Sequence, residues 1–420
     1  MTTGAGGWRE IWTPERARLW LMACTIGAYL PALGVPFRNW LDFSAFYAAG
    51  HFALSPDVAR LEPIVGYQLA NGLPITPYVY PAGVALPYAV LAALPYGLAA
   101  ALHLALMLGV LIGALVLGAD LYGIPRRWGV LGGLAWGPAA AGVLSGQNTS
   151  LALLLVLLAA RSLRRTETGG EAETTRTDGV GGGWIALLGY KPPLAAPLVG
   201  LLLLRGRWLA LVIASIGVLF HYALGLIAAG GNAAWPLDWI STLQRYSGAD
   251  LDANGWQAVS LPPILARVEV PGIAAPAGAL GGLAPIGYLL GAAIVLATVP
   301  ALRRWPIADA VALACAAGLV ISPHAWVYDA TLLLPGVALF ASWAARRGWR
   351  WQDRWLLAVG YGAAILWPIG GFLGFVFLAA ITTAAPIVLM RTVHADEPGD
   401  ADEPGDADKR TVATPMAGVL

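Results

Sequence analysis

The 420-residue chain is too apolar for an ordinary soluble domain, because 58% of its residues are hydrophobic and only 12% are charged. Soluble domains carry about 25% charged residues, and the mean hydropathy here is +0.68. We therefore expect lipid to surround most of the chain. A net charge of +1 excludes a general attraction to nucleic acid, and 18 Trp and 14 Tyr suit two membrane interfaces.

Ten apolar segments are predicted to span the membrane, judged against the ~20 residues that a bilayer requires. In chain order they are residues 17–36, 98–119, 128–144, 148–163, 207–229, 284–301, 306–321, 327–345, 353–369 and 371–390. Two more apolar stretches, 81–94 and 184–204, contain prolines, which interrupt helices. The sequence thus predicts an all-α polytopic membrane protein with about 10–12 transmembrane helices. The first helix is interpreted as a retained anchor, since no cleavage site follows it.

Arginine clusters set the predicted orientation, because short cytoplasmic loops collect Lys and Arg. With the N-terminus inside, and with 81–94 and 184–204 each entering and leaving the membrane from one side, all of the clusters become cytoplasmic. They are Arg9/Arg16/Arg18, Arg126–Arg127, Arg161/Arg164/Arg165, Arg205/Arg207, Arg303–Arg304, Arg346/Arg347/Arg350 and Arg391. Residues 1–16 and the tail 391–420 then lie in the cytoplasm. The tail repeats "ADEPGD" and is predicted to be disordered.

The same orientation divides the membrane domain, residues 17–390, into inner and outer connections. Two long outer loops are expected at 37–80 and 230–283, the first carrying short helices. A cytoplasmic loop is expected at 164–183, flexible over the Gly- and Thr-rich residues 166–183. Cys24 and Cys315 lie in separate apolar spans and are interpreted as small core residues, not as a disulfide.

Several polar positions within this apolar chain all fall on the extracytoplasmic side. They are Asp42, Tyr80, the pair Gln147–Asn148, Lys191 at the "KPP" break, and His324 and Asp329 in "ISPHAWVYD". Ionisable residues within a membrane protein are costly and mark functional sites by default. Because these polar residues share one side of the membrane, we predict that they form one outward-facing site.

Each of these residues also has a purely structural interpretation. Asp42 and Asn148 could cap the helices that follow them, and Lys191 could extend to a lipid headgroup. His324 could be a hydrogen-bonded turn residue, and Asp329 could pair with a neighbouring helix. Only the joint placement of these residues favours a site.

One carboxylate, one or two cations and a cavity bounded by lipid suit transfer from a lipid-linked phosphosugar. A prenyl phosphate leaves as a stable anion without a general acid, whereas glycoside hydrolysis normally uses two carboxylates. The acceptor hydroxyl needs a base, for which Asp42 suffices. Lys191 and His324 would offset the phosphate charge. The candidates for binding sugar or acceptor are Tyr47, Tyr80, Gln147, Asn148 and Trp326.

Five segments, in their order and spacing, resemble glycosyltransferase family 87 over residues 38–345. They are "DFSAFYAAG", "YPAG…LPYAVLAALP", "GQNTSLALLLVLLAARSLRR", "GGWIALLGYKPPLAAPLVGLLLLRGRW" and "SPHAWVYDATLLLP". The resemblance implies a GT-C type enzyme of the cell membrane that uses polyprenyl-phosphate-mannose or a related donor. It also implies a glycan or glycolipid acceptor, inversion at the anomeric carbon, and neither a cofactor nor an obligatory metal.

The resemblance assigns roles residue by residue. The base role falls on Asp42, the Lys-Pro element on Lys191, and the Ser-Pro…His element on His324. The Gly-Gln-Asn element corresponds to Gly146, Gln147 and Asn148. The chain departs from the family pattern in "YPAG", where Ala82 replaces a second proline, and this puts the geometry of the donor loop in doubt.

Two features leave other interpretations open. Asp250 and Asp252 in "GADLDANG" form an Asp-x-Asp pair, as metal-dependent transferases use, which we interpret as a polar turn. A multi-span transporter or flippase would also combine broken helices with intramembrane polar residues. No internal repeat is found and the polar residues gather on one face, which favours the transferase.

Overall fold

The computed structural model describes residues 13–30, 41–165, 171–268, 282–370 and 372–393, which are helical almost throughout. Prolines begin many of the helices, as expected at a first turn that has no N–H to donate. In chain order the helices are α1 (Pro14–Tyr29), α2 (Leu41–His51), η3 (Pro56–Ala59), α3 (Leu61–Ala70), η4 (Ala82–Val84), α4 (Ala85–Ala92), α5 (Tyr96–Tyr122), α6 (Arg126–Leu134), α7 (Gly137–Ser145), α8 (Thr149–Arg164), α9 (Glu171–Leu188), α10 (Pro192–Leu204), α11 (Trp208–Ala228), α12 (Trp235–Asn254), η6 (Gly255–Gln257), α13 (Leu261–Ala266), α14 (Ala284–Arg304), α15 (Ile307–Ile321), η8 (Val327–Leu333), α16 (Leu334–Arg346), α17 (Trp351–Gly370) and α18 (Phe372–Thr392).

The helices confirm an all-α polytopic membrane protein. Four helical stretches within the described ranges are long and apolar enough to cross a bilayer: Tyr96–Tyr122, Trp208–Ala228, Ala284–Arg304 and the continuous Val327–Arg346. Shorter apolar helices accompany them at Ala82–Ala92, Pro192–Leu204, Ile307–Ile321 and Val376–Thr392. The count of about 10–12 spans and the GT-C arrangement stay predictions from the sequence.

Two predicted segments have a different local structure. The single span predicted at 128–144 is divided into α6 and α7 at Ala135–Trp136, just before Pro138 in the first turn of α7. The interpretation of 166–183 as a flexible loop is wrong from Glu171 onward, because α9 begins there and continues to Leu188. The helix then breaks at the predicted "KPP" sequence, where α10 starts with two prolines. The N-terminal and C-terminal predictions fall largely on 1–12 and 394–420, outside the described residues.

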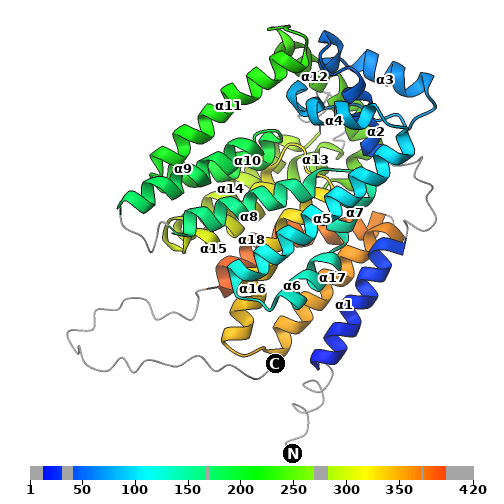
Figure 1. The fold of residues 1–420 in the computed structure, drawn as a ribbon. Coiled ribbons are helices and arrows are strands. Elements are labelled where there is room, and N and C mark those ends of the chain that lie inside the picture. The colour runs from blue at the N-terminus through cyan, green and yellow to red at the C-terminus, as the bar shows by residue number, and fades with distance from the viewer. Residues whose placement is uncertain (1–12, 31–40, 166–170, 269–281, 371, 394–420) are drawn as a thin grey trace, which may run out of the picture.

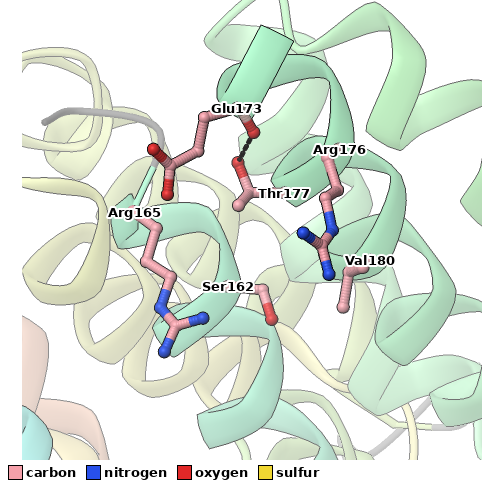
Figure 2. A pocket seen from close by; sticks show the side chains of 6 residues that line it. All are labelled: Ser162, Arg165, Glu173, Arg176, Thr177 and Val180. Carbon is pink, nitrogen blue, oxygen red and sulfur yellow. Dashed lines mark hydrogen bonds between the residues drawn. The ribbon is translucent and has the colours of Figure 1, made fainter. Parts of the chain in front are cut away.

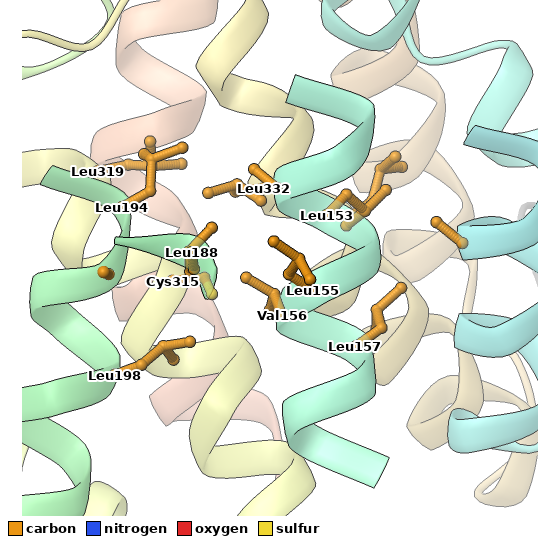
Figure 3. Packing of buried hydrophobic residues seen from close by; sticks show 14 of the residues in the cluster. Leu153, Leu155, Val156, Leu157, Leu188, Leu194, Leu198, Cys315, Leu319 and Leu332 are labelled. Carbon is orange, nitrogen blue, oxygen red and sulfur yellow. The ribbon is translucent and has the colours of Figure 1, made fainter. Parts of the chain in front are cut away.

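Buried aliphatic side chains hold the centre of the bundle together (Figure 3). They come from α8, α9, α10, α15 and η8, and include Leu153, Leu155, Val156, Leu157, Leu188, Leu194, Leu198, Cys315, Leu319 and Leu332. In lipid, such contacts stabilise helix pairs chiefly by close packing. This packing fixes where the ends of these helices lie, and the polar residues are at those ends.

The helices α2, α3 and α12, which belong to the two predicted outer loops, lie together at one end of the molecule (Figure 1). Trp239 of α12 donates from Nε1 to the Val79 carbonyl at 3.1 Å. Thr242 donates to the Ala59 carbonyl at 3.0 Å. Two loops far apart in sequence are therefore joined by two hydrogen bonds, of which the one from Thr242 is buried.

Arginines bind backbone carbonyls at the other end of these helices. Arg164, at the end of α8, donates to the Leu121 carbonyl at 2.7 Å, and Arg205 donates to the Leu302 carbonyl at 2.5 Å. Asn148 begins α8, so its 16 residues place Asn148 and Arg164 about 24 Å apart. Asn148 and Arg164 thus lie at opposite ends of α8.

Candidate active site

Asp42 is held in the first turn of α2 by donors from another part of the chain. Its carboxylate accepts hydrogen bonds from the side chains of Gln147 and Ser145, at the α7–α8 turn. Burial raises the pKa of Asp42 to about 6, although these two bonds and the charge of Lys191 lower it. Asp42 is thus mostly ionised at neutral pH and still basic enough to accept a proton.

The α7–α8 turn reaches Asp42 because it contains a glycine. Gly146 ends α7 with φ 78°, in the left-handed region that favours glycine. A Cβ at this position would lie 2.5 Å from Cβ of Phe43, the neighbour of Asp42. The "GQN" sequence therefore allows α2 to contact the turn closely enough for Gln147 to bind Asp42.

Tyr80 extends the same hydrogen-bonded chain. Its hydroxyl donates to Oε1 of Gln147 at 2.6 Å, so the Gln147 amide connects Tyr80 to Asp42. Burial raises the pKa of Tyr80 well above its ordinary value, so the hydroxyl stays protonated and able to donate. The ring lies parallel to Tyr190 at 6.4 Å and against Phe46 at 4.9 Å, which fixes its orientation.

Asn148 begins α8 without capping it, since its side chain makes no cap hydrogen bond. The side chain contacts the Tyr88 hydroxyl, and its backbone carbonyl accepts from the Tyr190 hydroxyl at 2.9 Å. Its Oδ1 is buried and finds no hydrogen-bond partner within the described part of the chain. A buried carbonyl oxygen of this kind is costly, and a ligand hydroxyl would satisfy it.

Lys191 and Asp329 form a buried ion pair with 2.5 Å between Nζ and Oδ1. The Lys191 side chain is 10% exposed and that of Asp329 is fully buried, so extension of Lys191 to a lipid headgroup is not what the structure shows. The second Asp329 oxygen accepts from the Trp326 backbone N–H at 3.0 Å. The alternative of Asp329 as a pairing residue agrees with this geometry. Two of the three Lys191 N–H groups are not used by this contact.

His324 faces a carboxylate that the sequence interpretation set aside. Asp250 Oδ2 lies 3.4 Å from His324 Nδ1, and the Trp326 ring packs edge-on against the imidazole at 4.6 Å. The interpretation of "GADLDANG" as a polar turn is wrong for Asp250, because α12 continues to Asn254 and buries it. Asp252, two residues on, is exposed, because successive positions two apart point to different sides of a helix. The two carboxylates therefore lie on different sides of α12.

These contacts join into one cluster. Asp42 interacts electrostatically with Lys191 and Asp250, and His324 interacts with Asp250, Lys191 and Asp329. Of the residues predicted from sequence, the cluster contains Asp42, Tyr80, Gln147, Asn148, Lys191, His324 and Trp326.

Tyr47 is not brought to the cluster. Its hydroxyl donates to the Leu94 carbonyl at 2.7 Å, and its ring packs against Phe43 and Tyr96. Tyr47 thus holds α2 against the start of α5.

A separate pocket lies at the other end of α8 (Figure 2). It has a volume of about 670 Å³ and is lined by Ser162, Arg165, Glu173, Arg176, Thr177 and Val180. The length of α8 separates it from Asn148, so it is not part of the Asp42 cluster.

A cluster of one half-buried carboxylate, an ammonium group, an imidazole and hydrogen-bonding side chains suits group transfer to a hydroxyl. Across the described ranges no three His, Cys, Asp or Glu side chains are placed to hold a metal ion.

Comparison with known proteins agrees with this chemistry. A sequence model of glycosyltransferase family 87 matches residues 78–323, more than half of the chain. The chain belongs to this family and is a membrane glycosyltransferase, so the transporter alternative is not retained. No curated protein and no solved structure matches the chain.

The matched range contains most of the cluster but not all of it. Tyr80, Gln147 and Lys191 lie within it, whereas Asp42 lies before it and His324 one residue after it. The contact between Gln147 and Asp42 therefore links the matched range to the candidate base.

Sequence reasoning missed two contributors to the site. Ser145 gave no signal beyond its place next to "GQN". The sequence did contain a signal for Asp250 as a site residue, because an acidic residue in an outer loop of an apolar chain requires a partner. Its partner was not predictable, since the pairing depends on how the outer loops fold together.

Proposed function

We propose that the protein transfers a hexose, mannose by family resemblance, from a polyprenyl phosphate to a hydroxyl of a glycan or glycolipid. The reaction takes place on the extracytoplasmic face of the cell membrane, with both termini in the cytoplasm. No cofactor or obligatory metal takes part. The observation that carries this proposal is the anchored carboxylate of Asp42 near the Lys191 ammonium group, at the end of α8 opposite Arg164.

In this proposal Asp42 is the general base. The acceptor oxygen forms a bond to the anomeric carbon from the side opposite the phosphate, and its proton passes to Asp42. The bond between the anomeric carbon and the phosphate oxygen breaks, and the electron pair stays on the phosphate. One displacement of this kind inverts the anomeric configuration, from a β-linked donor to an α-glycoside.

The remaining residues bind and orient the substrates. The leaving phosphate gains negative charge, which Lys191 and His324 offset. The unpartnered Oδ1 of Asn148 would accept from a sugar hydroxyl, and the Tyr80–Gln147 pair would hold Asp42 in line. Trp326 packs beside His324, where a sugar face or prenyl chain would lie.

A donor panel tests this function with the purified full-length protein in lipid vesicles. Radiolabelled polyprenyl-phosphomannose, polyprenyl-phosphoglucose and a nucleotide-linked mannose are each supplied with a mixed glycolipid acceptor. We expect transfer from a polyprenyl-phosphate sugar and none from the nucleotide sugar. Transfer from the nucleotide sugar alone would contradict the proposed donor class.

A further inference from the structure

Asp250 is a buried carboxylate outside the sequence-predicted site, and it is directed at His324. Its Oδ1 accepts from the Tyr246 hydroxyl at 3.0 Å and from Asn254 Nδ2 at 2.8 Å. Its Oδ2 lies 3.4 Å from His324 Nδ1. Two donors thus hold one oxygen, and the other is left for the histidine.

The backbone fixes this pairing. Val259, just after α12 and η6, donates from its N–H to the Ala325 carbonyl at 3.0 Å. Ala258 and Trp326 form an antiparallel bridge beside this bond. The chain that follows Asp250 is therefore attached to the chain that follows His324, so the pairing does not depend on the side chains alone.

The chemistry of the pair determines which ring nitrogen faces a ligand. An ionised carboxylate only accepts hydrogen bonds, so a hydrogen bond across this 3.4 Å contact requires the imidazole proton on Nδ1. The His324 side chain is 37% exposed and that of Asp250 is 6% exposed. The His324 side chain is thus partly accessible to a ligand, whereas the Asp250 carboxylate is not.

We propose that Asp250 is a positioning residue for sugar transfer, which accepts Nδ1–H of His324 and so presents Nε2 to the donor phosphate. This inference rests on the proposed function. In the Nδ1–H form Nε2 carries a lone pair, so the ring takes up one proton from solvent when the donor phosphate binds. The resulting Nε2–H donates to the phosphate, and Asp250 offsets the charge of the ring. The hydrogen bond is shared with the phosphate as the sugar leaves, so no proton beyond that of the acceptor has to move.

The other charged groups that face His324 also change the protonation equilibrium of its ring. Burial lowers the pKa of His324, Asp250 and Asp329 raise it, and Lys191 lowers it further. Asp250 also raises the pKa of Asp42. Loss of the Asp250 charge should therefore lower both pKa values.

The tautomer of His324 gives a test that needs no substrate. The chain has only five histidines, so ¹⁵N-histidine solid-state NMR in bilayers can resolve them, and His324→Gln assigns the signal. We expect an Nδ1–H ring in the wild type and in Asp250→Asn, whose amide oxygen still accepts. Asp250→Ala should release the ring to the Nε2–H form. A ring unchanged in Asp250→Ala would overturn the proposal.

Transfer kinetics provide the second test, with Asp252→Asn on the same helix as the matched control. Asp250→Ala should lower kcat about 10- to 100-fold, the loss typical when the partner that orients a functional histidine is removed. In a His324→Ala background the same change should have no further effect. Losses that multiply in the double variant would contradict action through His324.

The pH profile separates a positioning role from a purely structural one. In Asp250→Asn both limbs of the kcat profile should move to lower pH, because Asp42 ionises earlier and the His324 ring loses its proton earlier. Unchanged limbs would overturn the proposal. Failure of the proposed donor class would leave the NMR result unaffected, so the two claims fail separately.

Discussion

The carboxylate of Asp329 accepts the ammonium group of Lys191 at 2.5 Å and the backbone N–H of Trp326 at 3.0 Å. This one side chain joins the break between α9 and α10 to the segment that carries His324. Both charges are buried, so neither can lose its partner cheaply. The ion pair therefore connects the α9–α10 break to the segment that carries His324.

The ion pair predicts a non-additive effect on stability. Lys191→Met leaves Asp329 charged and buried, which costs about 3–5 kcal/mol. The double change Lys191→Met/Asp329→Asn removes both charges and should recover much of the loss. Thermal unfolding in detergent measures this, with exposed Arg127→Met as the control. A double variant no more stable than the single one would contradict the coupling.

We expect that adding one methyl group at Gly146 will strongly lower the transfer activity. In Gly146→Ala the new Cβ would lie 2.5 Å from Cβ of Phe43, in a backbone conformation with φ 78°. Displacing Phe43 separates Asp42 from Gln147, so transfer should fall strongly. Gly113→Ala in α5 is the control, because nothing lies within 4 Å of its Cβ. Equal activity of the two variants would show that the close contact is unimportant.

Gln147 predicts a shift in the pH dependence of transfer. Its side chain lowers the pKa of Asp42, which burial raises to about 6. In Gln147→Leu the pKa of Asp42 should rise further, so the acid limb of kcat/KM should move to higher pH. The limb reports the fraction of ionised base. An acid limb at the same pH in the variant and the wild type would exclude Asp42 as its source.

The predicted orientation can be checked by thiol labelling in intact cells. Gln244 is exposed on α12, and Arg127 is exposed at the start of α6, while Cys24 and Cys315 are buried. A membrane-impermeant maleimide should label Gln244→Cys in intact cells and Arg127→Cys only after permeabilisation. The reverse pattern would invert the topology and place the Asp42 cluster in the cytoplasm.

The apolar segments made the helices predictable, because a helix in lipid must satisfy its own backbone and so leaves a clear hydropathy signal. "KPP" likewise predicted the break before α10, since proline removes a backbone donor. Residues 171–183 were misjudged, because their Gly and Thr content favours a loop locally while α9 packs along α8 and α11. Tertiary packing overrode local preference there.

The site was predictable residue by residue but not in its pairings. Asp42, Gln147 and Lys191 stood out because polar groups are rare in this chain. Lys191 and Asp329 are 138 residues apart in the sequence, so their pairing depends on the tertiary fold. The pairing of His324 with Asp250 depends on the way α12 folds over the site. Sequence spacing carries no information on such pairs.

The most direct test of the central claim compares sugar transfer by the wild type and Asp42→Asn. Because the pKa of Asp42 is raised from 3.8 to about 6 in the folded protein, stability is lost as the pH rises between these two values, and the full cost of the ionised form is present at pH 7. The Asn variant should therefore unfold at no lower temperature at pH 7. Asp57→Asn in the same outer loop is the control.

The measurement is the initial rate of mannose transfer from polyprenyl-phosphomannose at pH 7. Equal amounts of folded wild-type and variant protein are compared. Loss of the base should lower the rate of Asp42→Asn about 10²- to 10⁴-fold, with Asp57→Asn unchanged. A folded Asp42→Asn variant that transfers mannose at the wild-type rate would contradict the assignment of Asp42 as the base.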